Sequence, residues 1–162
     1  MYDITDLKNF VTIMHMERPP APQNKKEMHT PKLEVRIRQQ PGDADVQYFE
    51  IGTGDELFSR AILTTEREPF TYCCLDKLTT APEHQDKGFA RQIMEHIQSY
   101  LEATNTPGIL CDIISEEGPA GMYERYGWKP LEGDPLTLGY NFDSIEQEKE
   151  LVRFFKDNFQ LQ

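Results

Sequence analysis

A glycine turn in the stretch Gln85-Asp86-Lys87-Gly88-Phe89-Ala90-Arg91 decides how this chain folds. A strand-like run over residues 71–80 precedes the turn, and apolar residues at helical spacing follow it, namely Ala90, Ile93, Met94, Ile97 and Leu101. The N–H groups at the helix start converge on one spot, where Lys87 and Arg91 add positive charge. The pattern indicates a phosphate or pyrophosphate site. Taken alone, it does not exclude a surface turn whose basic residues are solvated.

Four strand-like segments lie in the first half of the chain, over residues 33–39, 46–51, 57–65 and 71–80. Short turns join them, and in the first segment Leu33, Val35 and Ile37 alternate with charged residues. Strands joined by such short loops favour an antiparallel meander.

The periodicity changes after the glycine turn. A helix over residues 88–103 stops at Asn105-Thr106-Pro107-Gly108, and a buried strand over 109–114 follows. Strand, helix and strand form a crossover unit with parallel neighbours. The remaining predicted elements are a short helix over 119–126, a strand from Trp128, a strand over 136–142 and a final helix capped by Asp143.

These elements predict an α+β fold with a mixed central sheet of about six to seven strands flanked by helices. We expect an N-terminal helix and Pro-rich arm over residues 1–31, a central domain over 32–142 and a C-terminal helix over 143–162. No apolar run approaches membrane-spanning length, and the first ten residues carry two aspartates in place of a signal peptide's basic start. We therefore expect a cytoplasmic protein that does not enter a membrane.

The formal net charge of −11 weighs against nucleic acid and anionic membranes as partners. It favours cationic small molecules or basic protein segments, although solubility alone also explains it. The three cysteines and four histidines show no metal-ligand spacing, so we expect no metal. Cys73 and Cys74 are neighbours in a predicted strand, so their thiols should point to opposite faces and stay reduced.

Two motifs carry a resemblance to a known family. The segment 80–90 (TAPEHQDKGFA) resembles motif A of the GNAT superfamily of N-acetyltransferases, V-x-P-x-x-[QR]-x-x-G-x-[GA]. Residues 121–128 (GMYERYGW) resemble motif B of the same family, L-Y-x-x-x-G-[FW]. The motifs occur in the family's order and at its usual separation, which is more specific than either motif alone.

The resemblance implies acetyl-CoA as a co-substrate, bound where the motif A strand and the next strand splay apart. It implies backbone contacts to the pantetheine arm from Leu78, Thr79 and Thr80. The implied pyrophosphate cradle consists of Gln85, Lys87, Gly88, Phe89, Ala90 and Arg91, acting through backbone N–H groups and the charge at the helix start.

The resemblance also implies direct acetyl transfer from the thioester to a primary amine. Tyr123 stands at the family's tyrosine position and would be the general acid that protonates the leaving thiolate. A tyrosine on a short helix is otherwise a core aromatic, and Tyr126 is an alternative acid. An alkylammonium with a pKa near about 10.4 must also lose a proton before it attacks.

The general base is less well determined by the sequence. The position at which some family members carry a glutamate is occupied by Cys74, and Asp76 lies two residues further on the same strand face. A carboxylate in a strand that is predicted to be buried either has a functional role or is hydrogen-bonded within the sheet. Burial would raise its pKa. Glu116, Glu117 and a chain of water molecules are the other candidates.

Two departures from the family pattern bear on how the cofactor and the acceptor would bind. Residues 115–119 (SEEGP) lack the asparagine that contacts the cofactor in many members, and residues 39–46 are only a turn where the family has two helices. Either residues 1–16 replace those helices or the acceptor cleft is open. An open cleft favours a bulky acceptor such as a protein lysine or N-terminus over a small amine.

Two other functions fit parts of the sequence. One is a GNAT-fold binding module that holds CoA or a basic partner protein without catalysis. The other is a nucleotide-phosphate binder that uses only the glycine turn, against which motif B argues. A homodimer through the last strand or the C-terminal helix is also possible.

Overall fold

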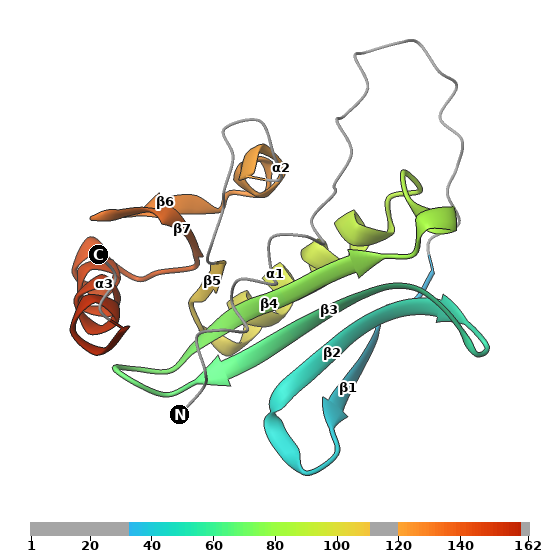
Figure 1. Cartoon of the computed structure of the whole chain (residues 1–162), viewed down its shortest axis with the longest axis horizontal. Coiled ribbons are helices and arrows are strands. Elements are labelled where there is room, and N and C mark those ends of the chain that lie inside the picture. The colour runs from blue at the N-terminus through green and yellow to red at the C-terminus, as the bar shows by residue number, and fades with distance from the viewer. Residues whose placement is uncertain (1–32, 111–119, 160–162) are drawn as a thin grey trace.

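The computed structural model describes residues 33–110 and 120–159, which form one mixed sheet with helices on both faces (Figure 1). Seven strands pair in the order β1-β2-β3-β4-β5-β7-β6. In chain order the elements are β1 (Arg36–Gln40), β2 (Asp43–Thr53), β3 (Glu56–Glu66), β4 (Tyr72–Thr80), the short 3-10 helix η2 (Pro82–His84), α1 (Phe89–Thr104), β5 (Gly108–Leu110), α2 (Ala120–Arg125), β6 (Lys129–Leu131), β7 (Asp134–Tyr140) and α3 (Ile145–Phe159). The predicted α+β sheet is confirmed.

The first four strands form the predicted antiparallel meander. β1 and β2 are joined by the tight turn Pro41–Gly42, in which Gly42 has a φ of +83° that favours glycine. No helix lies between these two strands, as the sequence predicted. Ile37 is an exception to the expected alternation, because its side chain on the edge strand β1 is 50% exposed.

Helix α1 packs on one face of β2, β3 and β4, and Figure 1 shows it behind β4. Four of the five residues predicted for its apolar stripe are fully buried, Ile93, Met94, Ile97 and Leu101, whereas Ala90 is only partly buried and Phe89 is buried in addition. The stripe packs on strand residues that include Phe49, Ala61, Leu63 and Leu75. The helix ends at Asn105, whose left-handed backbone closes the last turn.

Helix α3 supports a second apolar cluster, beside β6 and β7 in Figure 1. The cluster contains Tyr72, Ile109, Leu131, Leu151, Val152 and Phe155. Cys73 belongs to the α1 cluster, whereas Cys74 packs against the α3 cluster. The prediction that the two thiols face opposite ways is therefore confirmed. Among the residues described, no helix combines the length and apolar character of a membrane span.

One strand pair is parallel, and it positions the candidate site. β4 pairs with β5 at Cys73 and Cys74 only, opposite Gly108 and Ile109. Beyond Cys74, β4 has no partner on this side among the residues described.

The β3–β4 pairing contains one extra residue. Ile62 is opposite Lys77 and Leu63 is opposite Leu75, so Asp76 is the additional residue in β4. Such a bulge bends the strand and redirects side chains next to it.

One local prediction is wrong. Ser144, not Asp143, caps α3, because the Ser144 Oγ accepts the Gln147 N–H at 3.2 Å. Asp143 instead donates its backbone N–H to the Gln147 side chain at 2.9 Å, which completes a reciprocal cap. The predicted N-terminal helix and arm, Cys111, Glu116, Glu117 and the continuation of β5 lie outside the described residues.

Candidate functional site

The glycine turn has the backbone geometry that its sequence predicts. Asp86 and Gly88 both have positive φ angles, +57° and +78°. The first helical hydrogen bond runs from the Gln92 N–H to the Gly88 carbonyl at 3.1 Å. A Cβ added at Gly88 would meet nothing within 4 Å, so glycine is needed here for its backbone angle and not for space.

The turn leaves backbone donors available at the start of α1. The N–H groups of Phe89, Ala90 and Arg91 precede that of Gln92, the first N–H that bonds within the helix. Among the described residues no side chain caps them, and the first turn contains no acidic residue. Converging N–H groups at the positive end of a sixteen-residue helix form a site for an anion.

The charged side chains at this turn are partly engaged within the protein. Arg91 pairs with Glu95 at 2.9 Å, so its charge is partly neutralised, which the sequence analysis did not foresee. The Lys87 Nζ lies 3.4 Å from the His84 Nδ1, and the side chains of Lys87 and Arg91 are exposed. Gln85 donates its backbone N–H to the Pro82 carbonyl at 3.4 Å, which fixes the approach to the turn.

An aromatic platform on β3 supports the turn, and sequence reasoning missed it. The His84 ring stacks on Phe58 at a centroid distance of 3.9 Å, and Phe89 contacts both rings. The His84 Nε2 also lies 2.8 Å from a Glu56 oxygen. The only sequence signal is the meander itself, which pairs the start of β3 with the end of β4 through Ser59 and Thr80.

The same region brings together Glu56, Glu83 and His84, whose ligand atoms lie within 4.8 Å of one another. The spacing of these residues in the sequence gave no hint of this group. The His84 ring is already hydrogen-bonded to Glu56 and adjacent to the Lys87 ammonium, which opposes a cation at this position.

The three β4 residues assigned to the pantetheine arm pair with β3 and have no described partner on the side of β5. Leu78 is buried in the α1 cluster. Ser59 bridges the other two, because its hydroxyl donates to the Thr79 carbonyl and contacts the Thr80 hydroxyl, both at 2.9 Å. The Thr79 carbonyl and the Thr80 hydroxyl thus tie β4 to Ser59 on β3.

Asp76 lies half-buried in the β4 bulge. Its carboxylate accepts a hydrogen bond from the Thr64 hydroxyl on β3. Burial raises the pKa of Asp76 above its usual range, while hydrogen bonds from Thr64 and Cys74 oppose that rise. Thr64 and Cys74 are cross-strand partners, so the predicted shared face of Cys74 and Asp76 is confirmed.

A second carboxylate, Glu66, lies in the same region at the end of β3. Burial raises its pKa, and the charges of Asp76 and Asp45 add to the rise. Sequence reasoning did not single out Glu66. Its position opposite Tyr72 in the β3–β4 hairpin would have placed it on the face of Cys74.

Tyr123 lies in α2 and is fully buried in the α1 cluster. It contacts Trp128 edge to face at 6.4 Å, and its hydroxyl has no hydrogen-bond partner among the residues described. Burial raises the pKa of Tyr123 well above its usual range, so the hydroxyl stays protonated. Tyr126, the alternative acid, is half-buried, and burial is also the main cause that raises its pKa.

The predicted residues therefore fall into three groups. The motif A residues lie together at the start of α1, and Asp76 lies on the bulged strand with Thr64. Tyr123 lies in the core beneath α2, and no described hydrogen bond joins it to Asp76.

Comparison with solved structures gives matches of the same fold at low identity. The structure of AtaTR bound with AcCoA is 16% identical with a TM-score of 0.48, over 63% of this chain and 71% of the other. The ribosomal-protein-S18-alanine N-acetyltransferase from Escherichia coli is 17% identical with a TM-score of 0.46, over 59% of this chain and 66% of the other. The AtaT–AtaR complex bound to DNA is 12% identical with a TM-score of 0.51, over 74% of this chain and 99% of the other. At such identities the similarity concerns the fold alone.

The last of these structures is a complex bound to DNA, and none of the comparisons supports the expectation that nucleic acid is excluded as a partner of this chain. No curated protein sequence matches the chain significantly. The model of the acetyltransferase (GNAT) domain family matches residues 47–130, which is more than half of the chain and includes both motifs. The chain therefore belongs to the acetyltransferase (GNAT) family.

Proposed function

We propose that the protein is an acetyl-CoA-dependent N-acetyltransferase that acts on a primary amine. The observation that carries the proposal is the juxtaposition of two sets of backbone groups. The uncapped N–H groups at the start of α1 follow directly on β4, whose edge beyond Cys74 has no described partner on the side of β5. An extended ligand that ends in a diphosphate matches this pair of features.

The residues present fit such a ligand. Phe89, Ala90 and Arg91 would donate backbone N–H groups to the diphosphate, with Gly88 providing the turn and Gln85 and Lys87 beside it. Leu78, Thr79 and Thr80 would offer backbone groups to the pantetheine arm. When bound, acetyl-CoA supplies an acetyl group activated as a thioester.

Asp76 is the proposed general base. The acceptor amine is mostly protonated at neutral pH, because its pKa is about 10.4, and it needs a group that removes the proton. Burial makes the Asp76 carboxylate a better proton acceptor than an exposed aspartate.

Tyr123 is the proposed general acid. Its hydroxyl stays protonated and has no described partner, so it can donate a hydrogen bond to the leaving thiolate, and its raised pKa makes it a weaker acid than an exposed tyrosine. In this role Tyr123 would act only when the thioester of the bound substrate lies next to its hydroxyl in α2.

The acceptor is proposed to be a protein lysine or N-terminus in preference to a small amine. The turn Pro41–Gly42 replaces the helices that would otherwise lie between β1 and β2, which leaves room for a bulky acceptor.

One observation favours a second candidate, a CoA-binding module without catalysis. Tyr123 is fully buried, and no described contact links it to Asp76. A tyrosine in that position is also explained by packing against Trp128.

Two measurements test the proposal and separate the candidates. Thermal unfolding should shift upward with acetyl-CoA and CoA but not with ATP, because only the first two carry the pantetheine arm. Release of free thiol from acetyl-CoA should then depend on an added amine. Equal stabilisation by ATP would contradict the cofactor assignment, and stabilisation by CoA without thiol release across a panel of peptide and small amines would favour the binding module.

A further inference from the structure

The sheet face opposite α1 carries an unusual concentration of positive charge for a chain of net charge −11. Cross-strand partners point to the same side of a sheet, so the register defines two adjacent rows on this face. One row runs through Arg36, Glu50, Arg60 and Thr79, and the other through Arg38, Tyr48, Ile62 and Lys77. We call the four basic residues Arg36, Arg38, Arg60 and Lys77 the cationic face.

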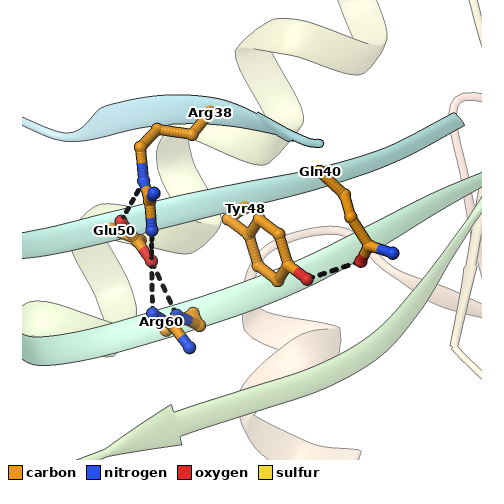
Figure 2. Close-up of polar contacts among 5 residues, drawn as sticks. All are labelled: Arg38, Gln40, Tyr48, Glu50 and Arg60. Carbon is orange, nitrogen blue, oxygen red and sulfur yellow. Dashed lines mark hydrogen bonds and ion pairs between the residues drawn. The ribbon is translucent and has the colours of Figure 1, made fainter. Parts of the chain in front are cut away.

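A single carboxylate organises the centre of the cationic face (Figure 2). Glu50 is 6% exposed, and its two oxygens accept hydrogen bonds from the Arg38 Nε at 2.8 Å and Nη2 at 2.9 Å. The Arg60 Nε donates to the same carboxylate at 2.7 Å. The arginines hold the pKa of Glu50 below its usual range, although burial opposes them, so Glu50 is ionised beneath two guanidinium groups.

Tyr48 fills the space beside this network. The guanidinium carbons of Arg38 and Arg60 lie 6.0 and 5.3 Å from the centre of its ring. Its hydroxyl donates to the Gln40 side chain at 2.6 Å, as Figure 2 shows. The two arginines are thus held in fixed positions by hydrogen bonds on one side and an aromatic ring on the other.

The network leaves positive charge directed at solvent. The side chains of Arg38 and Arg60 are 59% and 38% exposed, and each guanidinium has more N–H donors than Glu50 engages. Arg36 and Lys77 are exposed and form no ion pair with any described residue. Within the two rows, four cations outnumber the single carboxylate of Glu50, and Asp76 and Glu66 lie further along the same face beyond Lys77. The rows of arginines therefore form a surface complementary to an anion.

We propose that the cationic face binds an acidic segment of the protein whose amine is acetylated. This inference rests on the proposed function, because only an acetyltransferase would bind its partner as an acceptor. Whole-chain charge favoured basic acceptors, but the charge on this face is opposite to that of the chain. Fixed guanidinium groups suit carboxylates because they form paired hydrogen bonds with them.

The location of the face supports an acceptor over an unrelated partner. Lys77 follows the proposed base Asp76 directly in β4. Because of the bulge at Asp76, both side chains lie on the same sheet face: Asp76 contacts Thr64, and Lys77 is paired with Ile62. If an acidic segment of the acceptor protein bound to the arginines, the acceptor's neighbouring residues would lie near Asp76. The negative charge of the rest of the protein and the carboxylate within the network favour a short peptide over a nucleic-acid backbone.

The test uses a pair of charge-matched double variants of the full chain. R36Q/K77Q removes two exposed cations of the face that have no described ion pair, so the Glu50 network stays intact. K129Q/R153Q removes two exposed cations from β6 and α3 and changes the net charge equally. The probes are a fluorescent lysine peptide flanked by glutamates and a matched peptide flanked by glutamines.

Fluorescence anisotropy at low ionic strength should show that R36Q/K77Q binds the glutamate peptide about tenfold more weakly, whereas K129Q/R153Q changes affinity less than about twofold. The glutamine peptide should bind more weakly than the glutamate peptide to the unaltered protein. Equal losses in the two double variants, or equal affinity for the two peptides, would overturn the proposal. So would preferential binding of a DNA oligonucleotide that R36Q/K77Q abolishes.

Kinetics separate this inference from the proposed function. With the glutamate peptide as acceptor, R36Q/K77Q should raise KM about tenfold and leave kcat unchanged, and acetyl-CoA should still raise its thermal stability. If no peptide is acetylated by the unaltered protein, the acetyltransferase proposal fails. Binding of an acidic segment is then decided by anisotropy alone.

Discussion

Asp76 shows how one extra residue in a strand changes the chemistry of a carboxyl group. In a regular strand its neighbour Lys77 would face the other way, and Asp76 would be an ordinary sheet residue. The bulge leaves Asp76 half-buried against Thr64, and burial raises its pKa. The sequence indicated a candidate base at this position, whereas the bulge that shapes it depends on pairing with β3.

The proposed role of Asp76 predicts a pH dependence of activity. Because the carboxylate must be ionised to accept a proton, kcat/KM should fall as pH drops through the raised pKa of Asp76. The substitution Asp76→Asn should remove this acidic limb and lower kcat/KM by about 100-fold or more, measured by thiol release across pH. Loss of the limb in Glu66→Gln, with retention in Asp76→Asn, would assign the base to Glu66.

Stability should respond to the same group with a defined sign. A carboxyl group with a higher pKa in the folded chain binds its proton more tightly there than in the unfolded chain, where the value is about 4. The stabilisation from protonated Asp76 is therefore present at low pH and is lost as pH rises through the folded pKa. Asp76→Asn should unfold at a higher temperature than the unaltered protein at neutral pH, with the difference vanishing below pH about 4.

Tyr123 is the second residue whose role can be separated from its packing. Tyr123→Phe keeps the ring against Trp128 and removes a buried hydroxyl that has no described partner. We expect stability to be unchanged or to rise by up to about 1 kcal/mol, while kcat falls by about 100-fold and acetyl-CoA affinity is retained.

Tyr140→Phe is the matched control for this substitution. Tyr140 stacks on the same tryptophan and donates its hydroxyl to Glu102. Its substitution should cost about 1 kcal/mol of stability and leave kcat unchanged. Unchanged kcat in Tyr123→Phe would reduce Tyr123 to a core residue and favour the binding module.

At the scale of elements, the start of α1 depends on the left-handed backbone of Gly88. Gly88→Ala introduces no contact within 4 Å, so its effect comes from the φ angle of +78°. We expect a loss of about 1–2 kcal/mol in stability together with weaker acetyl-CoA binding, measured by chemical denaturation and calorimetric titration.

Gly42→Ala provides the control, because Gly42 has a φ of +83° and equally open surroundings in the β1–β2 turn. Its stability loss should be similar and its acetyl-CoA affinity unchanged. If Gly42→Ala weakened acetyl-CoA binding as much as Gly88→Ala, the motif A turn would lose its assignment as the cradle.

The long elements were predictable because their side-chain period is strong. The expected helix over residues 88–103 is α1, shifted by one residue, and the four strands of the meander start within three residues of their predicted positions. Features that depend on one or two residues, such as a helix cap, were harder to predict. Asp143 and Ser144 are both good capping residues, and only the hydrogen bond to Gln147 distinguishes them.

At the scale of the whole molecule, the predictable features are those that depend on neighbours in sequence. The glycine turn and the place of Asp76 on its strand belong to this class. The contacts of His84 with Phe58 and Glu56 were not predictable in this way, because the residues that they join are more than twenty positions apart in the sequence. The cationic face depends on the register of four strands, so the net charge of −11 concealed it.

The opposite orientations of Cys73 and Cys74 give the molecule two built-in reporters of local opening. One thiol lies under α1 and the other beside the α3 cluster, although the residues are adjacent in the chain. Burial raises the pKa of the Cys73 thiol, so its modification requires the α1 layer to separate from the sheet. In a Cys111→Ser background, the relative rates of thiol labelling would show which layer detaches first. Repeating the labelling with acetyl-CoA would then show whether the ligand slows the labelling of Cys73, of Cys74 or of both.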